Sequence, residues 1–414
     1  MSVSVSSIAY ALKRLYPQRR IENLVYQDNP FYAMVPKEGG FEGAVVAMAV
    51  RYADTQGRSA DFATAQARGQ ATNNSGVQFL ISRVKDYQLY TLETEAILAG
   101  KSDRGALVTT LDTEVGSALN NIGRSQSIQL YRDGAREIGQ LGSISGAGPY
   151  TWTLANINDI TNFEVGQFIV VSTGSTKTAL LRNSGGGVAI TGVDRDAGTF
   201  TTATNPDAAV ANDWIFMKGD RIAGSIAVAT TWLGISGLEA WNPATAPTAG
   251  DSFWSVDRSP DASRLAGLRI DVSAYNPEEG FVIALNRLAR EGVGPSNMFM
   301  NFADSRNVQL ALGSKAETVY QQVGDIGFST IRTRGPKGDV TITPDQNAPS
   351  GIGRLLTLST WKLRHLGDLI NILDMDGSRL LRESAADRFE GRMAFYGNLT
   401  CNAPGKNARV VLPT

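Results

Sequence analysis

The strongest alternation of apolar and polar positions lies near the end of the chain. From residue 389 to residue 401, the odd positions carry a series of apolar side chains: Phe389, Met393, Phe395, Leu399 and Cys401. A two-residue period places such a series on one face of a β-strand. We therefore expect a strand here, then a turn at Ala403-Pro-Gly405 and a second strand over residues 408–412.

A helical period appears over residues 103–140. Apolar side chains recur about once per turn at Leu107, Leu111, Val115, Leu119 and Ile122. Asp103 is the expected N-cap, with Ser102 as the alternative. Glycines within the segment each weaken an isolated helix by about 1 kcal/mol relative to Ala. The pattern predicts one long helix that depends on tertiary packing.

Residues 37–85 predict a long two-stranded excursion. The outgoing leg is the β-rich run 44–50, and Val77, Phe79 and Ile81 alternate with polar residues on the return leg. The tip between them is rich in small and polar residues. It carries five charged residues that we take as candidates for contacts between subunits: Arg51, Asp54, Arg58, Asp61 and Arg68. A lone hairpin is marginal in water. Because the sequence offers no local partner, we expect this hairpin to lean on a neighbouring copy.

The first 36 residues predict an arm with one short helix at 7–15, interrupted by three prolines. Such an arm has little to bury by itself. We expect it to lie on another part of the protein or on a neighbour.

Residues 142–220 predict a separate all-β insertion, either a barrel or a sandwich. Short apolar runs at 150–154, 167–171, 187–191 and 214–217 alternate with turn residues. After a loop-rich stretch, the pattern changes to that of an α+β region. Its expected helices are 278–291, with Phe281, Val282, Leu285 and Leu288 facing inward, and a short one capped by Asp304 and ending near Gly313. Its expected strands are 297–301, 328–334, 339–343 and 354–359.

Composition narrows the classes of function. The chain has 414 residues, room for two or three domains, with 39 Lys and Arg against 40 Asp and Glu. Such a balance lacks the basic excess typical of proteins that grip nucleic acid. One Cys and one His exclude a disulfide framework and a Cys/His zinc site, and they suit folding in a reducing cytoplasm. No apolar run nears the roughly 18 to 20 residues of a membrane span.

The sequence supplies no pattern typical of an enzyme. His365 has no Ser or Cys elbow to activate, and Cys401 continues the apolar face of the last long strand. Asp374-Met-Asp-Gly377 lacks the full ligand spacing of a calcium loop. Gly185-Gly-Gly187 is not followed by the Lys-Ser/Thr of a phosphate-binding loop. We predict no catalytic residue, no cofactor and no metal.

The order and local sequence of these segments resemble the major capsid protein family of tailed bacteriophages, whose fold is shared with encapsulin shells. The hairpin at 37–85 resembles the extended E-loop of that family, and the helix with Asn121-Ile-Gly-Arg-Ser125 and Leu130-Tyr-Arg-Asp-Gly134 resembles its spine helix. Further stretches resemble segments common in such capsid sequences: 235–241, 256–258, 264–267, 299–302, 311–315, 325–328, 335–338 and 396–405.

The resemblance implies an α+β tailed-phage major capsid fold with an all-β insertion. Its parts would be an N-terminal arm (1–36), an E-loop (37–85), a P-domain with the spine helix (86–141), the insertion (142–220), a mainly A-domain region (221–375) and closing P-domain strands (376–414).

The resemblance also implies a structural function rather than an enzymatic one. The chain would assemble with itself into pentamers and hexamers that close an icosahedral shell around double-stranded DNA, without sequence-specific binding. A separate scaffolding protein and a portal would be further partners, with a decoration protein as an optional one and no membrane contact. The expected location is the virion, after assembly in the cytoplasm of a bacterial host.

Three alternatives stay open at this stage. An encapsulin-type compartment would enclose a cargo enzyme instead of DNA. A β-rich tail or adhesin protein that binds carbohydrate would explain the insertion but neither the long helix nor the hairpin. An enzyme with an unrecognised site is supported only by ordinary carboxylates. The contents of purified particles distinguish the first alternative from a phage shell.

Some members of the capsid family cross-link covalently, joining an E-loop Lys to a neighbour's Asn. Between Lys37 and Lys85 this chain has no Lys. We therefore expect boiling in detergent to release monomers from assembled particles, as read by gel electrophoresis. A ladder of covalent multimers would contradict this expectation.

Overall fold

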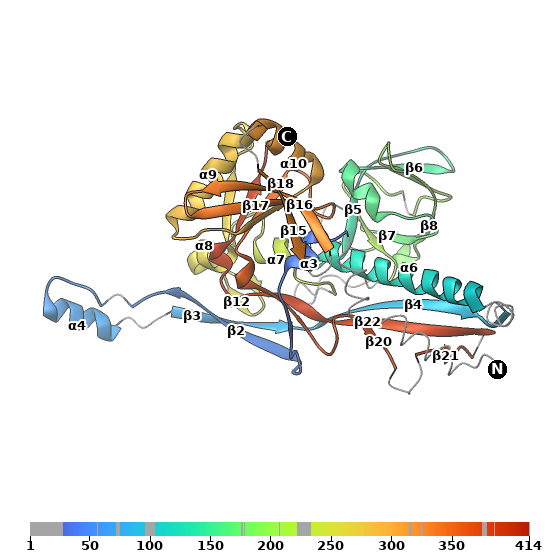
Figure 1. Cartoon of the computed structure of the whole chain (residues 1–414), viewed down its shortest axis with the longest axis horizontal. Helices are drawn as coiled ribbons and strands as arrows, with labels where there is room; N and C mark the ends of the chain where they lie inside the picture. The colour runs from blue at the N-terminus through green and yellow to red at the C-terminus, as the bar shows by residue number, and fades with distance from the viewer. Residues whose placement is uncertain are drawn as a thin grey trace. The chain divides into compact units, whose positions relative to one another are not determined.

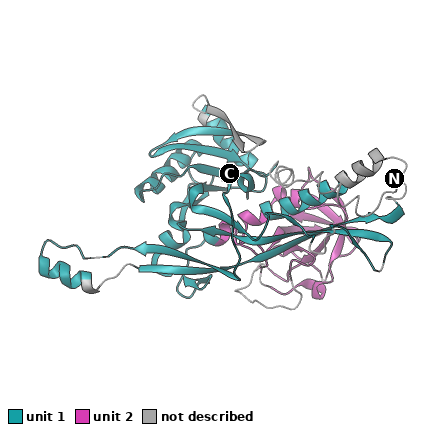
Figure 2. Cartoon of the chain, turned by 60° about the horizontal axis from the view of Figure 1, so that its bottom comes forward, with its two compact units in different colours: residues 1–127, 241–414 teal, residues 128–240 magenta. Residues whose placement is uncertain are grey.

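The computed structural model describes most of the chain: residues 28–55, 57–71, 75–95, 104–174, 177, 179–206, 208–221, 233–313, 317–323, 326–374, 379–384 and 386–413. The chain divides into two compact units (Figure 2). The first joins Met1–Ser127 to Trp241–Thr414, and the second is Ile128–Ala240. The predicted helix at 7–15 lies outside the described residues.

A six-stranded sheet in the first unit is organised around one long strand, β22 (Arg388–Cys401). One edge of β22 pairs antiparallel with β4 (Val84–Glu93), from Arg388–Glu93 to Gly397–Val84. The other edge pairs with β19 (Trp361–His365), β20 (Asn371–Ile372) and β21 (Leu381–Arg382). β1 (Lys37–Gly39) adds in parallel to β19.

The predicted alternation along β22 holds only in part. Met393, Phe395, Leu399 and Cys401 are buried as expected, and burial raises the pKa of the Cys401 thiol to about 12. Polar residues between them are buried as well, since both faces of the strand are covered near its end. Thus Asn398 donates its side-chain amide to the Ser82 carbonyl at 2.9 Å.

The predicted long helix is α6 (Arg104–Tyr131), which runs beside β4 and β22 (Figure 1). Val115, Leu119 and Ile122 are buried, as the periodicity predicts. The helix ends at Tyr131 rather than at residue 140, so the prediction was wrong for its last turns. Gly134 (φ 95°) and Arg136 (φ 64°) take left-handed conformations that stop a helix, and Glu137–Ser145 forms a strand instead.

A second, seven-stranded sheet in the first unit carries the α+β region. Its order is β13 (Leu268–Asp271), β23 (Ala408–Val411), β18 (Ile352–Leu356), β14 (Asn297–Met300), β17 (Gly338–Pro344), β16 (Ile326–Gly335) and β15 (Glu317–Val323). The helices α9 (Pro277–Arg290) and α10 (Phe302–Leu312) share one apolar core with its strands.

Two details of this region differ from the prediction. Val282 is 49% exposed rather than inward-facing, although Phe281, Leu285 and Leu288 are buried. The N-cap of α10 is Asn301, whose side chain accepts the Ala303 N–H at 3.1 Å. Asp304 instead accepts the Gly351 N–H at 2.8 Å and so ties the helix to a loop.

The end of the predicted arm packs on its own chain. In α3 (Pro30–Met34), Phe31 and Tyr32 are buried, and the Phe31 ring lies 5.0 Å from that of Phe299. Shorter elements complete the first unit or lie at its boundary: α7 (Leu238–Trp241), β11 (Ser252–Phe253), β12 (Val256–Asp257), η3 (Ser259–Asp261), α8 (Ala262–Ala266), η5 (Leu358–Thr360) and η6 (Pro404–Lys406).

The second unit contains a closed barrel, which resolves the choice between barrel and sandwich. Its strand order is β10 (Trp214–Met217), β5 (Glu137–Ser145), β6 (Tyr150–Leu154), β9 (Thr199–Thr202), β8 (Val188–Asp194) and β7 (Phe168–Val171). Short turns, η1 (Ile157–Asn162) and η2 (Arg182–Gly185), connect its strands. Phe200 stacks between Trp152 and Phe163, at centroid distances of 5.3 and 4.8 Å.

A buried ion cluster lies where α6 gives way to the barrel. Lys177 Nζ is 2.7 Å from an Asp133 carboxylate oxygen and 2.8 Å from one of Glu137. Arg132 binds Asp159 at 2.8 Å and approaches Glu137 at 3.9 Å. Burial, followed by the charge of Asp133, raises the pKa of Glu137, and the cations oppose that rise. Lys177 therefore separates two carboxylates that would otherwise repel each other.

Replacing Lys177 by Met should destabilise the barrel by about 3 kcal/mol at neutral pH, near the lower end of the cost of removing one partner from a buried pair. The loss should shrink as the pH falls. A carboxyl whose folded pKa is raised binds its proton earlier in the folded state, so folding gains between that pKa and the unfolded value of about 4.3. Peptide-level hydrogen exchange over β5 and β10 of the full chain, compared with wild type at each pH, measures this.

Arg195→Met is the matched control, because Arg195 pairs with Glu164 at 2.9 Å on the surface of the same unit. It should change stability by only about 0 to 1 kcal/mol. Equal losses in the two variants, or a Lys177→Met loss that does not depend on pH, would contradict the role assigned to the cluster.

Candidate functional site: the extended hairpin and a sheet face

The predicted excursion is a two-stranded hairpin of the first unit (Figure 1). β2 (Val45–Ala53) pairs antiparallel with β3 (Ser75–Ser82), from Val45–Ser82 to Ala53–Ser75, with a register shift between Arg51 and Ala53. The two strands form a sheet of their own, in which one face is buried and the other is exposed.

The base of the hairpin packs against its own chain. Met48, Val50, Phe79 and Ile81 are buried on one face. The Phe79 ring lies 5.2 Å from Trp241 and 6.1 Å from Phe253. The base of the hairpin therefore has a partner within its own chain, and the expectation that the hairpin leans on a neighbouring copy is wrong for this part. These partners are distant in sequence, so no local pattern could have revealed them.

The far end of the hairpin carries a helix that the sequence analysis missed, α4 (Phe62–Ala71). Asp61 caps it, accepting the Thr64 N–H at 2.8 Å and the Thr64 hydroxyl at 2.7 Å. These hydrogen bonds lower the pKa of the Asp61 carboxyl. The cap and the Ala and Gln content favour a helix, but no apolar stripe announces one.

This helix has no buried face among residues 62–69. Phe62 is 81% exposed, and only Ala65 is even partly covered. Isolated helices shorter than about 12 to 15 residues are marginal in water. Gly57 approaches Gly69 closely, with a Cβ at Gly57 only 3.2 Å from the Gly69 Cα. The loop and helix thus pack backbone to backbone, and their side chains remain available to a partner.

The five charged candidates all lie on this outer part of the hairpin. Arg51 and Asp54 pair at 3.1 Å, with both side chains more than 60% exposed. Asp61 acts as the cap of α4, while Arg58 and Arg68 are exposed. The structure thus brings Arg51 and Asp54 together and gives Asp61 a local role. Their contacts with another subunit remain a prediction.

A second exposed surface lies on the β4–β22 sheet, on the face opposite α6. Tyr87 and Leu89 are 52% and 50% exposed, and the Tyr87 ring lies 5.9 Å from that of Tyr396. Burial, then a hydrogen bond to Tyr87, raises the pKa of Tyr396. Lys85 and Arg392 border these three residues. The sequence analysis missed this face, although the alternation from Lys85 to Glu93 could have indicated it.

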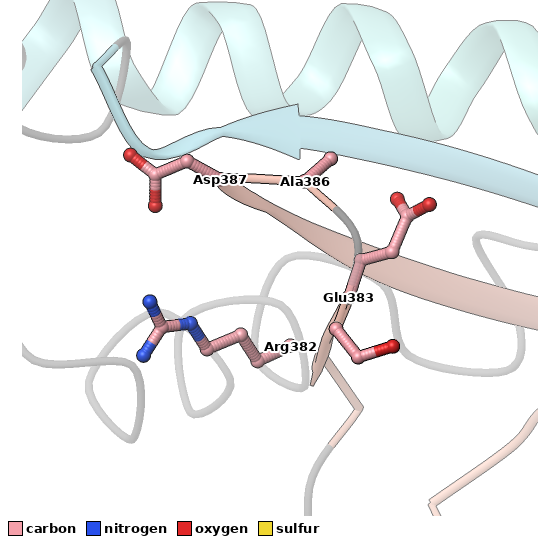
Figure 3. Close-up of a pocket in the computed structure, with 5 residues that line it drawn as sticks. Arg382, Glu383, Ala386 and Asp387 are labelled. Atoms are coloured by element: carbon pink, nitrogen blue, oxygen red, sulfur yellow. The ribbon is translucent and has the colours of Figure 1, made fainter.

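An open polar hollow of about 680 Å³ lies at the end of this sheet, lined by Arg382, Glu383, Ser384, Ala386 and Asp387. Figure 3 shows that the carboxylates of Glu383 and Asp387 point in different directions. Arg388 engages Glu383 in an ion pair. The two carboxylates therefore do not converge on one point (Figure 3).

The other candidates for chemistry lie apart. His365 ends β19, and its Nδ1 is 2.9 Å from the Gly367 carbonyl oxygen. Asp374 is described, but the rest of its Asp-Gly turn, 375–378, lies outside the described residues. Within the described ranges, no three His, Cys, Asp or Glu side chains gather as metal ligands, and no helix is long and apolar enough to cross a membrane.

These features define a mixed α+β protein whose notable surfaces are a projecting hairpin and an aromatic sheet face. No family model and no curated protein matches the chain. It is similar to a chain of the cyanophage A-1(L) capsid asymmetric unit, with 9% identity and a TM-score of 0.48 over 94% of this chain and 93% of that one.

Two further solved structures are similar over comparable lengths. They are a virus-like particle from Pyrococcus furiosus (9% identity, TM-score 0.40, 94% of this chain and 95% of that one) and the holo-SrpI encapsulin complex from Synechococcus elongatus (11%, 0.42, 97% and 94%). At such identities and scores the similarity assigns no role to any residue.

Phe79→Ala should destabilise the first unit by about 3 to 5 kcal/mol, because it removes a buried ring from the contact with Trp241. Leu80→Ala, at the next position but on the exposed face, should cost less than about 1 kcal/mol. Urea unfolding of the full chain, followed by tryptophan fluorescence, compares the two. Equal losses would mean that the hairpin base is not anchored as described.

Proposed function

We propose that this protein is the major capsid protein of a tailed bacteriophage, a shell subunit that assembles with copies of itself. The observation that carries the proposal is the tip of the hairpin. A capped helix stands on an anchored base and buries none of its described side chains. A partner surface outside the subunit would supply the missing cover.

The partner we assign to the tip is the β4–β22 face of the next copy. Hairpin and sheet face are different surfaces, so a contact between them is heterologous, and it generates a ring where the rotation between copies closes. Phe62 supplies an apolar group at the tip, and Tyr87, Leu89 and Tyr396 supply an aromatic receiving surface. Apolar area buried this way contributes about 25 cal/mol per Å².

The charged residues of the tip would set register more than strength. Exposed ion pairs contribute about 0 to 1 kcal/mol each. Arg51, Asp54, Arg58 and Arg68 present both signs of charge within a short length of chain. Such a pattern discourages a shifted or inverted docking, since misplaced like charges repel.

The remaining parts of the proposal follow from the resemblance of the sequence. Rings of five and six copies would close an icosahedral shell around double-stranded DNA. A near-neutral subunit, with 39 basic and 40 acidic residues, suits an inner surface that encloses DNA without gripping it. A separate scaffolding protein and a portal would assist assembly in the bacterial host cytoplasm, and no enzymatic step is assigned to the chain.

The test is assembly of the expressed full chain, followed by electron microscopy and sedimentation. Wild-type protein should form closed particles. Phe62→Ser should leave the unfolding midpoint unchanged, because Phe62 touches no core, but should reduce the yield of particles by about tenfold or more. Val165→Ser, at an apolar position of the barrel unit that is 65% exposed, is the matched control and should assemble normally.

The contents of wild-type particles decide what the shell encloses. In a phage-infected or prophage-bearing host, particles filled with DNA support the phage assignment, while a packaged cellular enzyme would indicate an encapsulin instead. A stable wild-type monomer that forms no particles under any condition, with its tip protected from hydrogen exchange, would overturn the proposal.

A further inference from the structure

The two helices that pack on the seven-stranded sheet carry exposed apolar side chains on their outward side. Its inward positions are filled by Phe281, Leu285, Leu288 and Val308, all buried. On the outward side, Phe302 is 57% exposed and Leu310 75% exposed, both on α10. Val282 on α9 is exposed too. These three side chains lie outside the buried core of the region.

The outward residues of α10 form a defined stripe. Phe302, Arg306 and Leu310 are spaced by four residues, which places them on one face over two turns. The Arg306 guanidinium donates one long hydrogen bond, of 3.4 Å, to the side-chain oxygen of the neighbouring Asn307. The stripe therefore presents one cation between two apolar groups.

The outward residues of α9 form the complementary stripe. Glu279, Val282 and Asn286 follow one another at helical spacing and are all exposed. The carboxylate stands one turn from an apolar side chain. Glu279 is the exposed anion at the N-terminal end of this stripe, and Arg290 is an exposed cation at its C-terminal end. Arg287 pairs with Glu291 at 2.6 Å.

We propose that the α10 stripe of one copy packs against the α9 stripe of a neighbouring copy, with Arg306 opposite Glu279 and Val282 between Phe302 and Leu310. This deepens the proposed function and rests on it, adding a second interface between copies. A copy of this chain is the partner that fits, because the apolar groups and the opposite charges needed for the contact are both present on the same subunit.

The area involved is modest, so the contact is expected to act together with the hairpin. Two helices in contact cover a patch well below the ~2,000 Å² of an obligate interface. An ion pair surrounded by apolar side chains is shielded from water. Attraction or repulsion between the two charges is therefore stronger there than at an exposed site. Charge reversal is therefore the most direct probe.

The experiment is a charge-swap cycle on the full chain. Arg306→Glu alone, and Glu279→Arg alone, should each lower the yield of closed particles by about tenfold or more, through like-charge repulsion repeated around the ring. The double variant should recover to within about twofold of wild type, because the pair is restored with its ends exchanged. Arg334→Glu, an exposed charge on β16, is the control and should assemble normally.

The outcomes separate the two proposals. If wild-type protein forms no particles, the proposed function fails. If wild type assembles and the single reversals assemble equally well, only this interface fails. Reversals that weaken assembly without rescue in the double variant also overturn the pairing. Thermal unfolding of each variant should match wild type, since the three substituted positions are exposed.

Discussion

The helix α4 buries none of its described side chains in the core of its own subunit. A short helix gains little from its backbone hydrogen bonds once the cost of ordering the chain is counted. Asp61 reduces that cost by capping the first turn, and the Gly57–Gly69 approach holds the loop against the helix. Neither feature buries apolar surface. Under the proposed function, Phe62 gains its cover from a contact with another copy of the chain.

The anchored base of the hairpin fixes the direction in which the tip projects. Phe79 is fixed between aromatic rings that belong to distant parts of the chain, and the Leu80 N–H donates to the Trp254 carbonyl at 3.1 Å. A hairpin held this way emerges from the body along a set line rather than sampling many directions. Preorganisation of that kind lowers the entropy lost when the tip docks.

Local periodicity in the sequence predicted the helices, strands and turns that depend on neighbouring residues alone. The strands at 150–154 and 214–217, the helix α9 and the turn at 335–338 all match the structure, because their patterns are set within a few residues. Two of the failures have long-range causes. Trp241 supplies the partner of Phe79 from more than a hundred residues away. Val282 looks like a core residue by type, and only the packing of the whole region shows that it faces outward.

The two proposed contacts have different characters, and a closed shell needs such a difference. A single heterologous contact can only generate a ring or an open filament. The hairpin, which would reach a sheet face of the next copy, tolerates changes of angle between copies, because only its tip must stay in register. A helix stripe with Arg306 between two apolar groups tolerates less, since a shift of one turn separates the charges. One interface that bends and one that fixes spacing would let the same chain form rings of two sizes.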